Sequence, residues 1–353
     1  MQDFNRFEIA KELWTRIQKD IPIPPVPQSI LDNFTGADKK RKSIPIQETL
    51  TADPKVLVAF PNVFNPNYTL PQLWWSAIAL PAYSTFSDTR YHGIGELTQY
   101  AYDNNISLPK FPLTKVRNEV LYKLLEWQQA LRALPETSHL LLVVLDGYRS
   151  MKMQAILYNI YRNFVQKENP HCNEARIDAK TQNMVSMPVT DRQKIDQCPP
   201  PHSTGWSVDV ALFDENKIYS LRRKREQYNV RDAMLNYGSQ FDEMMHPVFA
   251  DKRSETNYFE ENTNDLEARK NRRILYHLMD TLGFSNYPLE RRHYDYGNQF
   301  YAAMKWEKSA KYGFAWWRGD DGTIKEYLKP EMERLFEDRF LFHGTIQPED
   351  VWL

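Results

Sequence analysis

The feature that most constrains the fold is an uninterrupted apolar stretch that stops abruptly at a charged turn. In HLLLVVLDGYR (139–149) the apolar residues end at Asp146-Gly147. A short apolar run bounded by turn residues is typical of a buried strand. WSVDVALFD (206–214) alternates apolar and polar residues, and RRHYDYG (291–297) has a similar pattern. These two segments predict further strands of the same sheet.

Helices are predicted wherever apolar residues recur close to every 3.6 positions. Such segments occur at 8–19, from Thr114 to about 131, from Ser150 to about 164, and at 265–282. Residues 168–201 are polar and contain prolines, so we expect a long loop there. The sequence therefore predicts an α+β fold, with helices flanking a mixed or antiparallel central sheet.

Charge and cysteine content exclude several classes of function. Lys and Arg together number 45 and Asp and Glu number 46, so no net positive field attracts nucleic acid or an anionic membrane. The basic run RRKR (222–225) is interpreted as a solvated face. Two cysteines cannot form a disulfide framework or a cysteine-rich zinc module. The first twenty residues lack the apolar core of a signal peptide, which predicts a cytoplasmic location.

One segment carries two residues that can bind a metal ion. In PPHSTGWSVDVAL (200–212), Asp209 lies on the small, polar face of the predicted strand. Gly205 permits a tight bend, so that the imidazole of His202 can fold back toward this face. A neutral imidazole nitrogen and a carboxylate oxygen are good zinc ligands. Taken alone, the segment also fits an ordinary loop histidine beside a strand-edge aspartate.

A second segment, LERRHYDYG (289–297), places Glu290 three residues before His293. A carboxylate near a metal-binding histidine can accept a proton from a water that the metal activates. Along a strand this odd spacing would aim the two side chains at opposite faces. We therefore expect Glu290 in the turn that leads into the strand. Asp295 shares the face of His293 and is the alternative base.

The third segment, VVLDGYRS (143–150), places Arg149 just after the buried strand. Functional residues often follow the ends of core strands. The fixed charge and forked donors of a guanidinium suit a carboxylate or an oxyanion. The alternative is a structural arginine that pairs with Asp146.

The order of the three segments, DGYR, then HxxGxxxD, then ExxH, resembles the D-alanyl-D-alanine dipeptidases of the vancomycin-resistance type. These belong to a zinc D,D-peptidase family that also includes D-Ala-D-Ala carboxypeptidases. The resemblance implies one Zn²⁺ per chain, held by His202, Asp209 and His293 in a cleft of the sheet. It also implies that Glu290 is the general base and acid and that Arg149 stabilises the tetrahedral oxyanion.

The resemblance covers only part of the chain. NYGSQFDEM (236–244) adds to it, since the dipeptidases have a Gly-x-x-Phe-Asp-Glu segment after the first two ligands. We expect three parts: a proline-containing N-terminal extension (1–85), a zinc D,D-dipeptidase-like catalytic domain (86–310) and an aromatic C-terminal extension (311–353).

Two positions depart from the family pattern. Pro200 stands where the family often has serine, two residues before the first histidine. Arg292 stands where the family often has tryptophan, just before the last histidine. We expect Arg292 to line the site near Glu290, where a cationic side chain would change substrate preference.

The implied function is hydrolysis of D-alanyl-D-alanine or a similar small dipeptide by water that the zinc activates. A second hypothesis is a D,D-carboxypeptidase or endopeptidase that acts on larger peptidoglycan peptides. A third hypothesis, from another class, is a non-catalytic zinc-binding interaction protein. The presence of both Glu290 and Arg149 argues against the third, because a purely structural zinc site needs neither residue. The expected partner is a small peptide, with no nucleic acid and no membrane.

Overall fold

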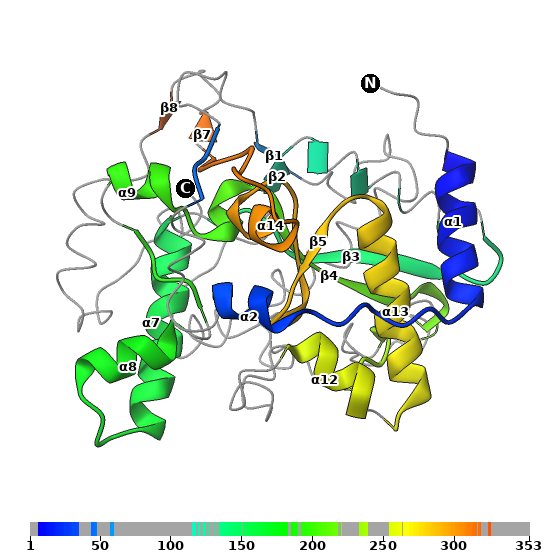
Figure 1. Ribbon diagram of the computed structural model, residues 1–353, viewed down its shortest axis with the longest axis horizontal. Helices are drawn as coiled ribbons and strands as arrows, with labels where there is room; N and C mark the ends of the chain where they lie inside the picture. The colour runs from blue at the N-terminus through cyan, green and yellow to red at the C-terminus, as the bar shows by residue number, and fades with distance from the viewer. Residues whose placement is uncertain are drawn as a thin grey trace.

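The computed structural model of the chain is drawn in Figure 1. It describes residues 6–34, 44–47, 57–59, 115–117, 119–120, 123–124, 127, 131, 134–149, 151–182, 185–189, 192–217, 220, 233–238, 254–262, 264–315, 317–318 and 324–325. The predicted helix-capping residues Thr114 and Ser150, the basic run 222–225 and the FDEM part of 236–244 lie outside the described residues.

A four-stranded antiparallel sheet forms the centre of the protein, with the strand order β3-β4-β6-β5. Its strands are β3 (Leu140–Asp146), β4 (Ser207–Asp214), β5 (Ser285–Tyr287) and β6 (Glu290–Asp295). The structure thus confirms the strands predicted at 139–149, 206–214 and 291–297, and with them the α+β fold. The short strand β5 was not predicted.

The register of the sheet brings residues from distant parts of the chain side by side. Asp209 of β4 pairs with His293 of β6 on one side and with Asp146 of β3 on the other. Two residues earlier in β4, Ser207 pairs with Asp295 of β6. Because every second residue of a strand faces the same side, these pairs form one polar face. The alternate residues of β4 and β6 pack in the main hydrophobic core.

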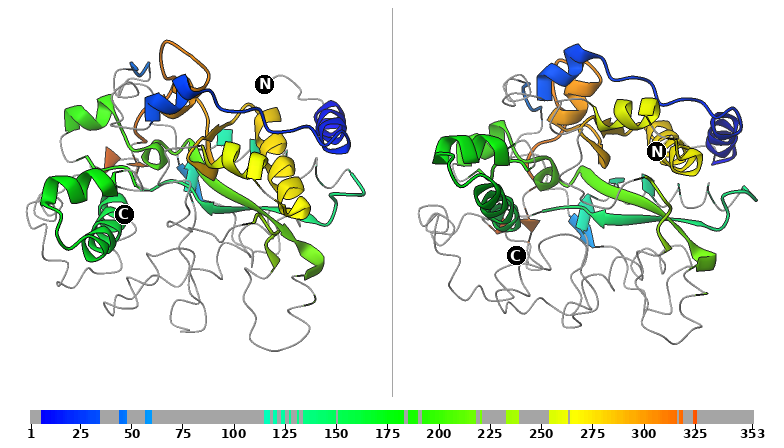
Figure 2. Two further views of the ribbon diagram at one scale, coloured as in Figure 1. Left: turned by 60° about the horizontal axis from the view of Figure 1, so that its bottom comes forward. Right: turned by 90° about the horizontal axis from the view of Figure 1, so that it is seen from below.

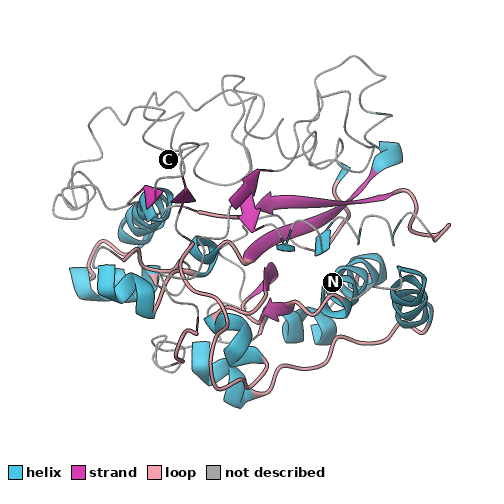
Figure 3. Cartoon of the chain, turned by 90° about the horizontal axis from the view of Figure 1, so that it is seen from above, coloured by secondary structure: helices cyan, strands magenta, loops and turns pink. Residues whose placement is uncertain are grey.

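Helices lie around the central strands (Figure 3). The helix predicted at 265–282 is α13 (Leu266–Thr281), and the carboxylate of Asp265 caps its first turn by accepting from the Ala268 N–H. Gly283, with a φ of 82°, ends the helix as predicted. The other long helices are α7 (Met151–Glu168) and α1 (Arg6–Gln18), and α1 packs against α13 (Figure 2).

The expectation of a long loop at 168–201 was wrong. The segment contains α8 (Glu174–Thr181) and α9 (Arg192–Gln197), followed by the 3-10 helix η1 (Pro201–Thr204). Asn173 caps α8, and ion pairs join its residues Glu174 and Asp178 to Arg162 of α7. Short helices with few buried residues resemble loops in composition, so their apolar pattern was too weak to identify them.

The helix predicted to start at Thr114 begins later than expected. Residues Lys115–Arg117 form strand β2 instead, which pairs with β1 (Leu57–Ala59). The Arg117 guanidinium is buried and donates to the Thr204 carbonyl over 2.7 Å, which ties β2 to η1. The described residues that follow, from 119 to 131, are helical and bury Val120 and Leu124 as the pattern predicted.

Segments from both predicted extensions contact the central body. From the N-terminal side, α2 (Gln28–Phe34) packs against α14 (Gln299–Met304). From the C-terminal side, the Tyr312 ring stacks on Trp206 with ring centroids 3.8 Å apart. Further described elements are α12 (Glu255–Asn262), β7 (Trp317–Arg318) and β8 (Ile324–Lys325). The division of the chain into three parts stays a prediction.

Among the described helices, none combines the length and the apolar character needed to cross a membrane. The cytoplasmic location stays a prediction of the sequence.

Candidate metal centre

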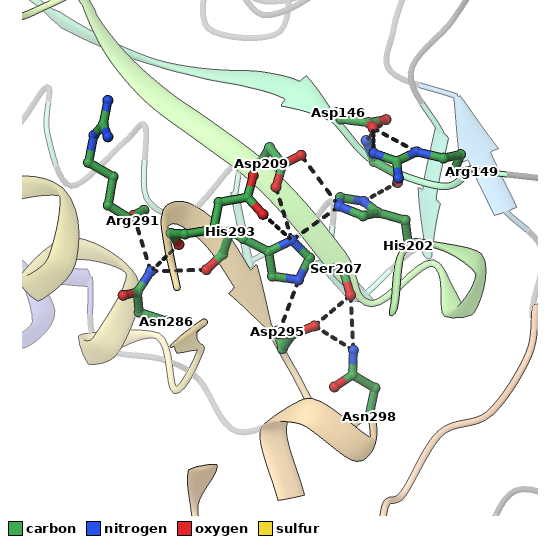
Figure 4. A network of polar contacts seen from close by, with 12 residues as sticks. Asp146, Arg149, His202, Ser207, Asp209, Asn286, Arg291, His293, Asp295 and Asn298 are labelled. Atoms are coloured by element: carbon green, nitrogen blue, oxygen red, sulfur yellow. Dashed lines mark hydrogen bonds and ion pairs between the residues drawn. The ribbon is translucent and has the colours of Figure 1, made fainter. Parts of the chain in front are cut away.

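Three predicted ligands, His202, Asp209 and His293, meet at one point beside the sheet (Figure 4). Nε2 of His202 lies 3.1 Å from Nδ1 of His293. The Asp209 carboxylate completes the group, with Oδ2 3.4 Å from Nε2 of His202 and Oδ1 3.1 Å from Nδ1 of His293. The structure thus brings together three side chains that the sequence analysis selected from two separate segments.

Local backbone geometry explains how His202 reaches the strands. It lies in η1, and Gly205 ends this short helix with a left-handed φ of 71°. Glycine adopts such a φ without steric cost, as expected for the tight bend before β4. The His202 carbonyl accepts hydrogen bonds from the backbone N–H groups of Gly205 (3.1 Å) and Arg149 (3.3 Å). The turn after β3 and the turn before β4 are therefore joined at this histidine.

The geometry of the three residues fits a metal ion. Zinc–nitrogen bonds of 2.0–2.1 Å in a tetrahedral site place neighbouring ligand atoms about 3.3 Å apart, close to the separations between these side chains. All three side chains are buried, and Oδ1 of Asp209, although 3.1 Å from Nδ1 of His293, makes no well-aligned hydrogen bond with the described residues. Because a buried carboxylate oxygen is costly without a partner, this atom is well suited to an ion. Two imidazoles and one carboxylate leave a fourth position open, as catalytic zinc sites do.

Each imidazole has a partner on the side that faces away from the centre. Nδ1 of His202 lies 2.7 Å from the Gly147 carbonyl, to which it can only donate, so Nε2 keeps its lone pair. Nε2 of His293 lies 3.1 Å from Oδ2 of Asp295, which leaves Nδ1 for the centre. The two histidines thus face the site through different ring nitrogens.

The charges around the centre favour a cation. Burial would raise the pKa of Asp209, but the attraction of His202 and His293 outweighs burial and lowers it. Burial would lower the pKa of His293, but Asp295 and Asp209 outweigh burial and raise it well above its ordinary value. Two buried carboxylates therefore favour positive charge at the His293 side of the centre.

Glu290 stands at the edge of the centre, but it belongs to strand β6 and not to the preceding turn, where the sequence predicted it. It is the first residue of β6, directly after the turn at 288–289, and it pairs with Tyr287 because the register of β5 against β6 shifts between Asn286 and Tyr287. This irregularity lets Oε2 of Glu290 approach to 4.0 Å from Nδ1 of His293. The Glu290 side chain is 46% exposed, so its carboxylate has access both to solvent and to the centre.

Arg149 lies beside His202 and is held on two sides (Figure 4). Its Nε and Nη2 donate to Oδ2 of Asp146 over 3.1 and 2.5 Å, and Nη1 donates to the Gln154 side chain over 2.9 Å. Burial opposes the charge, but Asp146 and Asp209 outweigh it and raise the Arg149 pKa. The pairing with Asp146 that the sequence left open is therefore present. A guanidinium has five N–H donors, and the hydrogen bonds to Asp146 and Gln154 use three of those of Arg149.

Arg292 does not line the centre, contrary to expectation. Neighbouring residues of a strand face opposite sides, so Arg292 points away from the face that carries His293. It is 3% exposed, and its guanidinium carbon lies 5.4 Å from the centroid of the Tyr237 ring. The departure from the family pattern at this position thus affects packing behind β6.

Two buried imidazoles and a carboxylate, with a further carboxylate at the rim, are the donor set of a metal-dependent hydrolase. The family model Peptidase M15, described as D-ala-D-ala dipeptidase, matches residues 91–310, which is more than half of the chain. The chain belongs to this family and is a metal-dependent peptidase that acts on small peptides. No curated protein matches it.

Several residues that hold the predicted ligands in place were not predicted from the sequence. Gly147 supplies only a backbone carbonyl, and nothing in its residue type indicates that role. Ser207 and Asn298 both bond to Asp295. Ser207 left a weak signal, because it lies two residues before the predicted ligand Asp209, as Asp295 lies two residues after His293. This period of two places all four side chains on one face.

Proposed function

We propose that the chain is a zinc-dependent dipeptidase that hydrolyses D-alanyl-D-alanine or a similar small dipeptide. In this proposal His202, Asp209 and His293 hold one Zn²⁺, Glu290 is the general base and acid, and Arg149 stabilises the oxyanion. The observation that carries it is the convergence of three buried side chains, whose nearest nitrogen and oxygen atoms lie 3.1–3.4 Å apart, with the Glu290 carboxylate beside them. The donor set of two nitrogens and one oxygen favours zinc over harder ions such as Mg²⁺ or Ca²⁺.

When bound, zinc supplies a Lewis acid that polarises the peptide carbonyl and lowers the pKa of a water to about 7. The chain's own residues do the rest. Glu290 Oε2 accepts the proton of the attacking water and returns it to the nitrogen of the leaving amine. The guanidinium of Arg149 keeps donors for the oxygen that becomes negative, while Asp146 and Gln154 hold it in place.

The decisive variant is Glu290→Gln, which preserves size and removes the proton acceptor. We expect normal folding and full zinc content, with kcat lower by about a thousandfold, within the usual range for loss of a general base. Glu267→Gln is the matched control, because Glu267 is an exposed glutamate on α13. Loss of zinc in Glu290→Gln would make the residue a ligand. Retention of both zinc and activity would refute Glu290 as the base.

The substrate is tested separately by incubating the zinc-loaded protein with D- and L-dipeptides and with peptidoglycan peptides. The proposal expects cleavage of free D,D-dipeptides and little action on longer peptides. Release of terminal D-Ala from the longer peptides alone would favour the carboxypeptidase hypothesis. Tight zinc binding with no hydrolysis of any peptide would favour the interaction protein.

A further inference from the structure

We propose that Asp295 is a positioning residue that fixes Nδ1 of His293 as the nitrogen facing the metal. This inference rests on the proposed function, since it assumes that His293 is a ligand. It concerns a residue outside the three ligands and assigns it a role distinct from that of a base.

Asp295 is completely buried, and one of its carboxylate oxygens is held by two hydrogen-bond donors. Oδ1 accepts hydrogen bonds from the Ser207 hydroxyl and from the side-chain amide of Asn298, each over 2.6 Å. Oδ2 faces Nε2 of His293 over 3.1 Å. The two donors to Oδ1 fix the plane of the carboxylate and so keep Oδ2 next to the imidazole of His293.

The two donors are themselves fixed by the fold. Ser207 lies directly opposite Asp295 in the register of β4 and β6. Asn298 caps α14, where its Oδ1 accepts from the Tyr301 N–H over 2.9 Å, so its amide nitrogen must point back toward Asp295. That amide also donates to the Ser207 hydroxyl over 2.9 Å. The carboxylate of Asp295 therefore has no freedom to rotate away from His293.

This arrangement decides which nitrogen of His293 binds the ion. A negatively charged acceptor at Nε2 keeps the proton on Nε2 and raises the electron density at Nδ1. His202 has only a neutral carbonyl at the equivalent place, that of Gly147. The two imidazole ligands are thus unequal, and His293 should be the stronger donor.

The geometry argues against Asp295 as the general base. Nδ1 and Nε2 are on different edges of the imidazole, and Nδ1 faces Asp209 while Nε2 faces Asp295. The ring of His293 therefore separates Asp295 from the ligand atoms. Glu290, in contrast, approaches the Nδ1 edge.

The test measures zinc affinity by competition with a chelator, in the full-length protein stripped of metal and reloaded. We expect Asp295→Asn to weaken zinc binding by about 10- to 100-fold, the usual effect of removing such an outer partner. Circular dichroism should show an unchanged fold. Nitrogen chemical shifts of the zinc-loaded protein should show that His293 has lost its fixed Nδ1 coordination. The control is Asp214→Asn at the far end of β4, which should bind zinc like the wild type.

Each outcome separates the two proposals. Wild-type protein that binds no zinc overturns the proposed function and this inference together. Wild-type protein that binds zinc, with Asp295→Asn within twofold of it, overturns this inference alone. If Asp295→Asn kept its zinc affinity and lost its activity, Asp295 would be a catalytic base and not a positioning residue. If Asp295→Asn does not fold, Ser207→Ala replaces it, because loss of one donor to Oδ1 should still weaken binding severalfold, and unchanged affinity there refutes the inference.

Discussion

Replacing Leu13 by alanine tests whether the N-terminal segment is part of the catalytic body. Leu13 lies in α1, is fully buried and belongs to the same core cluster as the strands β3 and β4. Buried leucine-to-alanine changes cost about 2.7–5.0 kcal/mol, with the larger values where the cavity cannot collapse. We expect Leu13→Ala to lower the free energy of unfolding by about 3 kcal/mol, near the low end of this range, because α1 packs against α13 and can shift to fill part of the cavity.

The assay is urea unfolding followed by circular dichroism. With a slope of about 3 kcal/mol per molar urea, a loss of about 3 kcal/mol lowers the midpoint by roughly 1 M. Lys11→Ala, on the exposed side of the same helix, is the control and should shift the midpoint by less than about 0.2 M. Equal midpoints for the two variants would refute the reasoning, since α1 would then unfold independently of the core. The midpoints can be compared as stabilities only if the two variants and the wild type show the same dependence of unfolding free energy on urea concentration.

Three further predictions address the site and the pH dependence of stability. His202→Ala and His293→Ala should each bind little zinc by metal analysis, and full occupancy in both would contradict the ligand assignment. Arg149→Ala should keep its zinc and lose kcat by about 10²- to 10³-fold through the oxyanion; an unchanged kcat would leave Arg149 a structural role alone. Burial lowers the pKa of His277, whose Nε2 bonds to the Ile21 carbonyl. The unfolded chain therefore binds a proton at His277 more readily than the folded chain does, so the free energy of unfolding should fall as the pH drops through and below 6.5. Urea midpoints measured between pH 7 and pH 5 should show this fall in the wild type and lose it in His277→Gln.

Much of the fold followed from patterns that depend only on neighbouring residues. The strands β3 and β4 and the helix α13 have strong apolar periods and clear end signals, such as Gly283 after α13. The strand β2 did not follow from such patterns, because its conformation depends on pairing with β1, more than fifty residues earlier. Helices α8 and α9 were missed because they bury too few residues to leave a period.

The candidate site shows the same division. Residue types and spacing, strengthened by a family resemblance, selected the residues that meet at the centre. The placement of Arg292 was wrong because the expectation followed its nearness to Glu290 in sequence and not the alternation of the strand. The hydrogen bonds of Asp295 with Ser207 and Asn298 depend on the sheet register, which no local pattern determines.

The pairing of β4 with β6 has a consequence for how the protein acquires its ion. His202 and His293 are 91 positions apart in the chain and come together only when this part of the sheet is complete. The unfolded chain therefore offers no comparable site, and an ion binds almost entirely to the native state. By mass action, free ion at one hundred times its dissociation constant would stabilise the native state by about 2.7 kcal/mol. Metal supply would thus act on the abundance of the folded protein as well as on its activity.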